Sequence, residues 1–467
     1  MIKITLIGHE CFYGLNDVLR LFFGATREDR ELGFLECDAP IDLDIVSKYD
    51  DKVLTYVKGE EERWESEFKS AFDGQLPLKR EVKRQLYYML SKITGLEFPW
   101  GCLTGIRPTI VAGEEKDPDA LVRKYMVRPD KARLCIDTYR KEEQILELEE
   151  ADAMNIYIGV PFCPTRCAYC SFVSQEISHH LGRLHEYADA LVKEIAIIGP
   201  KLKAVASLYV GGGTPTVFDE DDLKKVMDAV SRYIRFTEPH EITVEAGRPD
   251  TLSEEKLRIL KDHGVQRICI NPQTLNDETL RKFNRAHTAK DYVNIVKKAQ
   301  EIGFEVINSD LIAGLNSEEP EELIGSLEEL FELKVENITI HTLYKKRRAV
   351  IGRDDVMGRS DRLDEVLSKA YEMLEGKGYK PYYMYRQKDT SHGLENVGFA
   401  LEGTECLYNV AMMTDKRDVL AIGAGSVSKR MFDNGRLERF STTKDVIGYI
   451  REPEEIAKGK LTFFELG

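Results

Sequence analysis

Three closely spaced cysteines are the residues with the clearest chemical meaning in this sequence. Cys163, Cys167 and Cys170 lie in "VPFCPTRCAYCSF", and the next cysteine along the chain is Cys269. A structural zinc site usually takes four protein ligands, so three thiolates on one loop favour another centre. A [4Fe-4S] cluster has four irons, and three thiolates leave one iron open for a ligand that is not protein. The spacing therefore predicts a [4Fe-4S] cluster bound by these three residues.

Strand-like and helical patterns alternate around and after the cysteine loop. The six predicted strands are "NIYIGV" (155–160), "SLYVGG" (207–212), "EITVEA" (241–246), "RICIN" (267–271), "FEVINSD" (304–310) and "NITIHTL" (337–343). Amphipathic stretches between them predict helices, one of which begins at a capping box of Thr251 and Glu254 and ends at Gly264. Six successive βα units predict an α/β fold with a parallel sheet curled into a partial or complete barrel.

Polar residues follow the predicted carboxyl ends of these strands, where a βα barrel gathers its active site. The second strand ends in the glycine turn "GGGTPT", whose backbone can approach a ligand closely. The polar residues after strands three to six are Glu245, Gln273, Asp310 and His341. A buried carboxylate is costly unless it meets donors such as ribose hydroxyls or a cationic sulfonium, although a salt bridge or a cap would serve equally for either carboxylate alone. Together they predict a ligand pocket at this end of the barrel.

The cysteine spacing on a loop after a first barrel strand resembles the signature of radical S-adenosylmethionine (SAM) enzymes. The stretches "GGGTPT", "EAGRPD", "PQTLNDETLRKFNRAHT", "SDLIAGL" and "IGAGSVS" follow it in the order of the oxygen-independent coproporphyrinogen III oxidase family. The segments "LTGIRPT" and "ECLYN" most resemble the HemZ-type coproporphyrinogen dehydrogenases within it. This resemblance implies a radical SAM partial (β/α)6 barrel with an N-terminal α+β extension and a small C-terminal domain.

The resemblance also implies cofactors, partners and a reaction. The implied cofactors are a [4Fe-4S] cluster and SAM, with the methionyl amine and carboxylate of SAM on the open iron. The implied reaction is reductive cleavage of SAM, hydrogen abstraction from a propionate of coproporphyrinogen III, and loss of carbon dioxide to leave a vinyl group in anaerobic porphyrin and haem biosynthesis. The implied partners are a tetrapyrrole substrate and an electron donor such as flavodoxin or ferredoxin.

Eleven residues resemble the family's SAM-binding residues by position. They are Tyr157, Tyr169, Gly212, Gly213, Thr214, Glu245, Gln273, Arg285, Asp310, His341 and Val427. At Tyr169 and His341 the family has a different residue, and Val427 is a weaker match. Arg285 in "KFNRAHT" would pair with the SAM carboxylate as a bidentate donor. No residue is assigned a catalytic role.

Two positions depart from the established oxidases of this family. Phe172 replaces a fourth cysteine two residues after Cys170, and Gly159 replaces a histidine. Both departures are shared with branches that handle haem without making it, although the haem-chaperone branch carries an HNxxYW-like segment where this chain has "ECLYN". Three functions therefore remain open: a coproporphyrinogen III dehydrogenase, a haem-binding chaperone or haem-modifying radical SAM protein, and a non-enzymatic iron–sulfur or zinc module.

The whole chain of 467 residues is long enough for more than one domain. We predict an N-terminal α+β region at 1–150, the barrel at 151–380 and a C-terminal substrate-side region at 381–467. In the first region, "IKITLIG", "LGFLECD" and "KVLTYVKG" predict a small sheet, and "REVKRQLYYMLSKITG" predicts a helix.

The charge and hydropathy of the chain limit its partners and its location. A net charge of -15 argues against a broad contact with nucleic acid or anionic lipid. No apolar run approaches the roughly 20 residues of a membrane span, so we expect a cytoplasmic protein. A basic stretch at 345–348 could attract substrate carboxylates or be a solvated loop. The residues that could line a macrocycle site, or pack a domain junction instead, are Tyr382, Tyr383, Tyr385 and Arg386.

Overall fold

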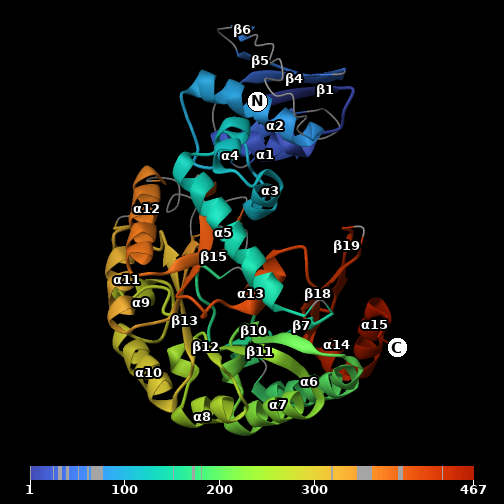
Figure 1. The fold of residues 1–467 in the computed structure, drawn as a ribbon, viewed down its shortest axis with the longest axis vertical. Coiled ribbons are helices and arrows are strands. Elements are labelled where there is room, and N and C mark those ends of the chain that lie inside the picture. The colour runs from blue at the N-terminus through green and yellow to red at the C-terminus, as the bar shows by residue number, and fades with distance from the viewer. Residues whose placement is uncertain are drawn as a thin grey trace. The chain divides into compact units, whose positions relative to one another are not determined.

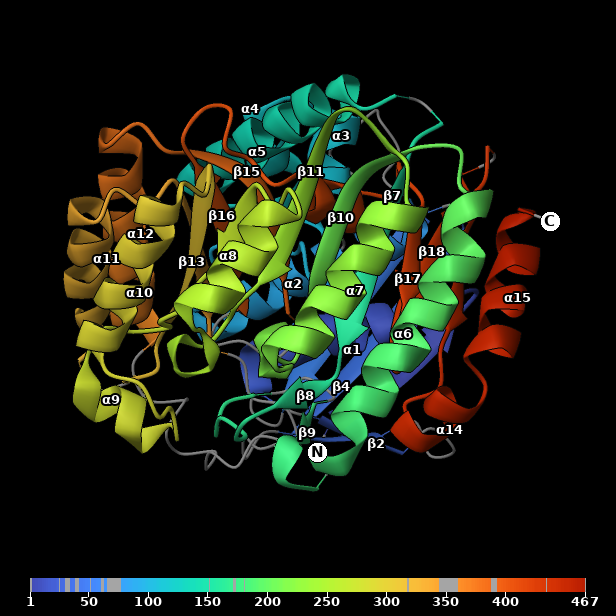
Figure 2. The same cartoon turned by 90° about the horizontal axis from the view of Figure 1, so that it is seen from below.

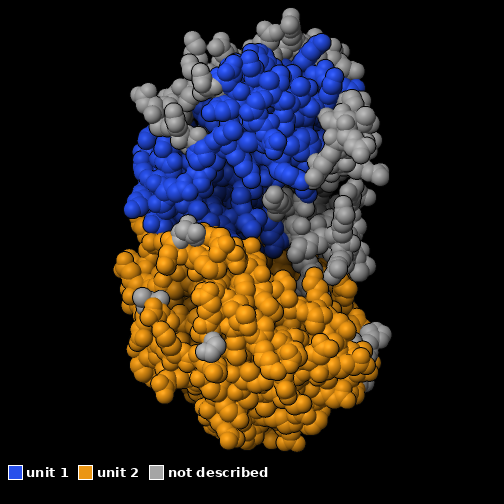
Figure 3. Space-filling view, turned by 90° about the vertical axis from the view of Figure 1, so that its right-hand side faces the viewer, with its two compact units in different colours: residues 1–139, 385–395 blue, residues 140–384, 396–467 orange. Residues whose placement is uncertain are grey.

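A computed structural model describes most of the chain. The described residues are 2–24, 26–29, 34–37, 42–50, 52–59, 63–64, 77–150, 152–170, 174–179, 181–316, 319–343, 360–387, 393–433 and 435–466. They form two compact units, residues 1–139 with 385–395 and residues 140–384 with 396–467, which Figure 3 colours separately. The predicted division at residues 150 and 380 stays a prediction.

The second unit contains the predicted barrel strands. They are β7 (Met154–Val160), β10 (Val205–Gly212), β11 (Phe236–Glu245), β12 (Arg267–Cys269), β13 (Val306–Ala313) and β14 (Asn337–Thr342). These six strands are neighbours in one sheet, in the order β14-β13-β12-β11-β10-β7, and every pair is parallel. Apolar side chains such as Ile156, Leu208 and Ile268 are fully buried on them, as expected for a parallel sheet covered on its outer face. The predicted fold class is confirmed.

Helices cover the outer face of these strands, as Figure 1 shows for the lower arc of the molecule. They are α6 (Leu184–Ile198), α7 (Glu220–Tyr233), α8 (Glu254–Asp262), α9 (Asp277–Lys282), α10 (Ala289–Ile302), α11 (Glu322–Glu332) and α12 (Ser360–Gly376). In Figure 2, α6, α7 and α8 lie side by side in front of β10 and β11. Each crossover from one parallel strand to the next therefore passes through this helical layer.

The capping prediction for α8 is wrong in one detail. Ser253 is the N-cap, and its side chain accepts a hydrogen bond from the Lys256 N–H. Thr251 instead ends a short 3-10 turn that begins at Pro249, and its hydroxyl donates to the Arg248 carbonyl. Because this turn occupies residues 249–251, the N-cap of the helix is Ser253, two residues after the predicted Thr251. Gly264, with φ of +77°, follows the helix end as predicted.

The C-terminal residues add strands to both edges of the barrel sheet. On the β14 edge the additions are β16 (Glu395–Ala400), which is antiparallel to β14, and β15 (Lys380–Arg386). On the β7 edge they are β17 (Val419–Ile422), parallel to β7, then β18 (Val427–Met431) and β19 (Leu437–Ser441). The helices of this region are α13 (Leu407–Met413), α14 (Val446–Arg451) and α15 (Pro453–Phe464). The sheet order begins at β15 and ends at β19, so the described strands form an open, partial barrel.

The first unit is a small sheet with helices. Its strands are β1 (Ile2–Ile7), β2 (Thr26–Asp29), β3 (Phe34–Cys37), β4 (Leu43–Asp50), β5 (Lys52–Gly59) and β6 (Arg63–Trp64), in the order β2-β3-β1-β4-β5-β6. Its helices are α1 (Phe12–Phe23), α2 (Leu78–Thr94), α3 (Pro108–Glu115), α4 (Pro118–Tyr125) and the start of α5 (Pro129–Leu148). Buried residues on α1 and α2, such as Leu19 and Leu86, form its core. Within the described chain, no helix combines the length and the apolarity needed to cross a membrane.

Candidate functional site

The cysteine loop follows β7 and lies at the carboxyl ends of the barrel strands. Cys163 ends β8 (Phe162–Cys163), which pairs with β9 (Gln175–Glu176), and the Cys170 N–H donates to the Cys167 carbonyl at 3.0 Å. All three cysteines are partly exposed and none is in a disulfide. Burial raises the pKa of the Cys163 thiol, and the nearby Cys170 and Cys167 raise it further. The three thiols are therefore close enough for their charges to affect one another.

Two hydrogen-bond donors point at these sulfurs. The Thr214 hydroxyl lies 3.6 Å from Cys163 Sγ, and Arg285 Nη1 lies 3.8 Å from Cys167 Sγ. Donors and a cation favour the thiolate over the thiol, as a metal centre requires. Among the described residues, no three acidic, histidine or cysteine side chains could hold a single metal ion. In a [4Fe-4S] cluster each thiolate binds its own iron, so this set fits a cluster without converging on one point.

Arg248 fixes the cysteine loop to the end of β11, a role that the sequence did not reveal. Its Nη1 donates to the Thr165 carbonyl at 3.1 Å and to the Thr165 hydroxyl at 2.8 Å. Its other nitrogens pair with both oxygens of Asp250 at 3.0 and 2.8 Å. Only an arginine with a carboxylate two residues later in "GRPD" could have signalled a buried, pre-organised guanidinium.

Glu245 lies beside the glycine turn after β10. Its Oε2 accepts from the Gly212 N–H at 3.1 Å, and its Oε1 accepts from the Tyr209 hydroxyl at 2.7 Å. Gly212 has φ of +117°, and a Cβ on Gly213 would lie 2.3 Å from the Phe162 carbonyl oxygen, so this turn requires glycine. Burial raises the pKa of Glu245 to about 7, and the negative charge of Asp310 adds to that effect.

The raised pKa of Glu245 predicts a pH dependence of stability in the cofactor-free protein. Its ordinary value is 4.5, so between about pH 4.5 and pH 7 the folded state binds more protons than the unfolded state. The free energy of unfolding therefore falls as pH rises through this window, on the order of 3 kcal/mol for this group. We expect Glu245→Gln to be more stable than the parent at pH 8 but not at pH 5, in urea unfolding. If the free energies of unfolding of variant and parent differed equally at both pH values, the raised pKa of Glu245 would be contradicted.

Three tyrosines stack inside the barrel next to Glu245. The Tyr157 ring centroid lies 6.4 Å from that of Tyr209 and 5.9 Å from that of Tyr408, and the last two are 4.6 Å apart. Tyr157 was predicted to contact SAM, whereas Tyr209 and Tyr408 were not predicted. Tyr408 belongs to α13, so the C-terminal region supplies a wall of the barrel interior. Its position in "ECLYN" was the only sequence signal.

The remaining strand-end residues gather around β13. Asp310 accepts from Asn308 Nδ2 at 2.9 Å, and His341 Nε2 lies 3.5 Å from its carboxylate. Gln273 has φ of +70°, and its backbone bonds to β13 on both sides, at Asp310 O and Ile312 N. Its side-chain Oε1 is buried without a hydrogen-bond partner. This orphaned acceptor marks Gln273 as a residue with capacity for a ligand donor.

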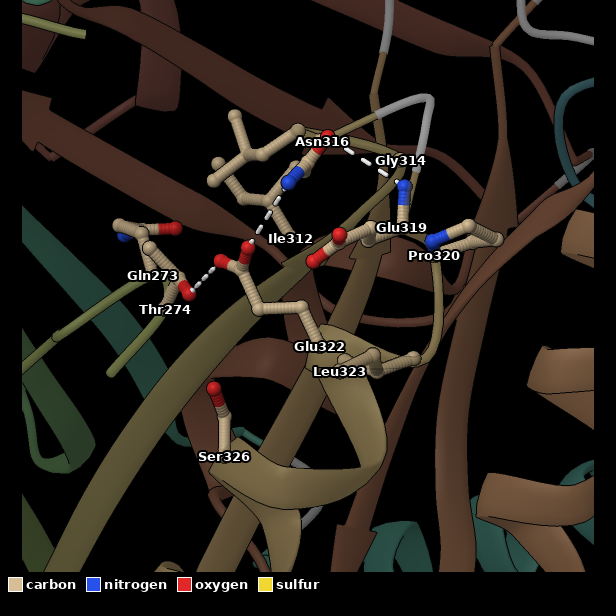
Figure 4. Close-up of a pocket in the computed structure, with 11 residues that line it drawn as sticks. Gln273, Thr274, Ile312, Gly314, Asn316, Glu319, Pro320, Glu322, Leu323 and Ser326 are labelled. Carbon is tan, nitrogen blue, oxygen red and sulfur yellow. Dashed lines mark hydrogen bonds between the residues drawn. The ribbon is translucent and has the colours of Figure 1, made fainter. Parts of the chain in front are cut away.

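A cavity of about 10 Å³ adjoins Gln273 at the carboxyl end of β13, and Figure 4 shows it. Glu322 lines this cavity and accepts from the Thr279 hydroxyl at 2.9 Å and from Asn316 Nδ2 at 3.2 Å, and also from the Thr274 hydroxyl. Such a volume holds about one water molecule. The hydrogen bonds of Glu322 therefore hold the segment that follows Gln273, and the cavity itself is too small for a nucleoside.

The other predicted residues have varied environments. The Tyr169 hydroxyl accepts from Arg285 Nη1 at 3.0 Å, and its ring packs against Phe283. Val427 starts β18, pairs with Ser441 of β19 and is 38% exposed. A Cβ at Gly159 would lie 3.1 Å from the Tyr157 ring, so a side chain at this position would require a small shift of that ring.

The macrocycle-lining interpretation of Tyr382, Tyr383 and Arg386 is wrong. Tyr382 is fully buried with its hydroxyl near Asn337 Nδ2 and Asn409 Nδ2, both at 3.3 Å. The Tyr383 hydroxyl bonds to Thr339 at 3.3 Å. Arg386 is buried in the first unit, where it lies over the Trp100 ring. These side chains are buried because β15, which carries them, is part of the barrel sheet. The basic stretch at 345–348 and Phe172 lie outside the described residues.

Comparisons with known proteins agree with this geometry. Residues 157–330 match the radical SAM superfamily. HemZ of Bacillus subtilis, an oxygen-independent coproporphyrinogen-III oxidase-like protein, is 35% identical over 83% of this chain and 82% of its own length. The heme chaperone HemW of the same organism is 32% identical over 58% of this chain and 69% of its own length.

The fold also matches a solved structure. Coproporphyrinogen III oxidase (HemN) from Escherichia coli superposes with a TM-score of 0.53 at 22% identity, over 67% of this chain and 72% of that chain. A [4Fe-4S] cluster and SAM are the cofactors of the radical SAM superfamily, and therefore of this chain. With the cysteine loop, the open barrel and a relative aligned over most of both lengths, the chain belongs to the oxygen-independent coproporphyrinogen III oxidase family of radical SAM proteins.

Proposed function

We propose that this protein is an oxygen-independent coproporphyrinogen III dehydrogenase of anaerobic porphyrin and haem biosynthesis. The observation that carries the proposal is the cysteine loop at the same end of the barrel as Glu245, Gln273 and Asp310. The relative that extends over most of both lengths is named an oxidase-like protein, which supports a coproporphyrinogen substrate. A cytoplasmic location and a flavodoxin or ferredoxin as electron donor are part of the proposal.

The site residues divide into two groups in this proposal. Cys163, Cys167 and Cys170 hold the [4Fe-4S] cluster. The residues that bind SAM are Tyr157, Tyr169, Gly212, Gly213, Thr214, Glu245, Gln273, Arg285, Asp310, His341 and Val427. When bound, the two cofactors supply a carbon-centred radical that abstracts hydrogen. The buried carboxylates of Glu245 and Asp310 suit ribose hydroxyls and a cationic sulfonium, because those groups offset the cost of their burial.

The proposed reaction removes three things from each propionate. One hydrogen atom leaves the carbon next to the pyrrole, the carboxylate leaves as carbon dioxide, and one electron passes to a one-electron acceptor, so that a vinyl group remains. This chain's residues bind and orient the reactants and keep water out. In this proposal the stacked rings of Tyr157, Tyr209 and Tyr408, of which Tyr209 bonds to Glu245, help to keep water from the reactants.

A haem-handling role is the second candidate, and two observations favour it. HemW proteins, named heme chaperones, match this chain at up to 32% identity. Gly159 and Phe172 both replace residues of the established oxidases, and a Cβ at Gly159 would lie 3.1 Å from the Tyr157 ring, so a larger side chain there would require that ring to shift. This candidate keeps the cluster and SAM but predicts tight haem binding and no vinyl product.

One experiment separates the two candidates. The protein is incubated anaerobically with dithionite, SAM and coproporphyrinogen III that carries deuterium on the propionate β-carbons, and the products are read by mass spectrometry. We expect deuterium in 5′-deoxyadenosine and accumulation of harderoporphyrinogen or protoporphyrinogen. Label that stays on the substrate while haem binds tightly would replace the dehydrogenase with the haem-handling function.

A further inference from the structure

Arg285 is a buried cation that meets no carboxylate among the described residues. It is 6% exposed, and its Nη2 donates to the carbonyls of Gly247 at 3.2 Å and Asn271 at 2.5 Å. Its Nη1 donates to the Tyr169 hydroxyl and Cys167 Sγ, and its Nε is buried with no partner. The groups that its Nη1 meets are the neutral Tyr169 hydroxyl at 3.0 Å and Cys167 Sγ at 3.8 Å. A buried guanidinium left in this state requires a nearby anion.

Other buried arginines of this unit are neutralised differently. Arg248 is bonded by both oxygens of Asp250, and Arg267 pairs with Glu241 at 2.7 Å. In the described part of the chain, Arg285 instead lies against the sulfur of a proposed cluster ligand, Cys167, at 3.8 Å. The Tyr169 hydroxyl accepts from the same Nη1 at 3.0 Å, so it holds the guanidinium beside this sulfur. The structure therefore places a fixed positive charge against one of the three proposed cluster ligands.

We propose that Arg285, assisted by the Tyr169 hydroxyl, raises the reduction potential of the cluster through Cys167, as a positioning residue that acts without SAM. The inference rests on the proposed cluster at Cys163, Cys167 and Cys170. Reduction adds one electron to the cluster and so increases its negative charge. A fixed cation and hydrogen bonds at a ligating sulfur stabilise the reduced state more than the oxidised state, and burial strengthens the effect because water screens it poorly. Binding of the SAM carboxylate alone would not require the contact with Cys167.

The test is a redox titration of the reconstituted full-length protein without SAM, with dithionite as reductant and the reduced cluster followed by electron paramagnetic resonance. The variants are Arg285→Met, which removes the charge, Arg285→Lys, which keeps it, and Tyr169→Phe, which removes the hydroxyl that accepts from Arg285 Nη1. Arg281→Met is the matched control, because it removes an exposed guanidinium of α9 four residues away. Iron and sulfide contents are measured first in every sample.

We expect Arg285→Met to lower the ratio of reduced to oxidised cluster at a fixed solution potential at least tenfold, a downward shift of about 59 mV for one electron. Arg285→Lys and Tyr169→Phe should give smaller shifts in the same direction, and Arg281→Met none. A ratio of reduced to oxidised cluster that is unchanged in Arg285→Met would overturn the proposal. If Arg285→Met takes up no cluster, unchanged ratios in both Arg285→Lys and Tyr169→Phe would overturn it instead. A parent protein without a cluster would instead contradict the proposed function.

Discussion

Alanine at Cys163, Cys167 or Cys170 is expected to abolish the reductive cleavage of SAM. In the proposed cluster each of these thiolates binds a different iron, so the loss of one would leave a second open iron and a cluster that is readily lost. The other described cysteines of this unit, Cys269 and Cys406, are buried, so we expect neither to replace a lost ligand. The measurement is 5′-deoxyadenosine formed anaerobically with dithionite, together with iron and sulfide content. We expect product at background in all three variants.

Cys11→Ala is the matched control for this experiment. Cys11 is also partly exposed, but it lies at the start of α1 in the first unit. Its removal should leave iron content and cleavage unchanged. Full iron content in a triple variant of the loop cysteines would show that the cluster is bound elsewhere, and the assignment would then be wrong.

Lys460→Met is expected to destabilise the folded protein strongly, because it breaks a fully buried ion pair. Lys460 Nζ lies 2.5 Å from Glu194 Oε1, and both side chains are 0% exposed. Glu194 Oε2 also accepts from the Tyr449 hydroxyl at 2.6 Å and the Gly423 N–H at 3.1 Å, so the carboxylate joins α6, α14, α15 and the loop after β17. Removal of the lysine leaves this carboxylate buried and unpaired, at a cost of about 3–5 kcal/mol.

Urea unfolding of the parent and the variant measures this loss. Lys458→Met on the same helix is the matched control, since Lys458 pairs with Glu455 in a solvent-exposed bridge, with the two side chains 62% and 71% exposed. That change should cost less than about 1 kcal/mol. The double variant Glu194→Gln with Lys460→Met removes both charges and should regain part of the stability. A loss below about 1 kcal/mol in Lys460→Met would mean that the pair contributes nothing net to folding.

The local patterns in the sequence were sufficient for the barrel and the cysteine loop. Apolar runs such as "NIYIGV" and "SLYVGG" became β7 and β10, because a parallel strand covered by helices is apolar on both faces. The three cysteines lie within eight residues, so their proximity needs no tertiary contact. The glycine turn is equally local, since φ of +117° at Gly212 is a property of its own backbone.

Only the tertiary structure decided which distant residues complete the site. Arg285 and Cys167 are 118 positions apart, and neither carries a sign of the other in the sequence. Arg248 reaches Thr165, and Tyr408 enters the barrel from the C-terminal region, for the same reason. Conversely, the aromatic run at 382–385 looked like a binding surface but is largely buried, because edge strands extend the barrel sheet there. A sequence pattern records which side chains can form a contact, whereas the packing of the elements selects the pairs that do.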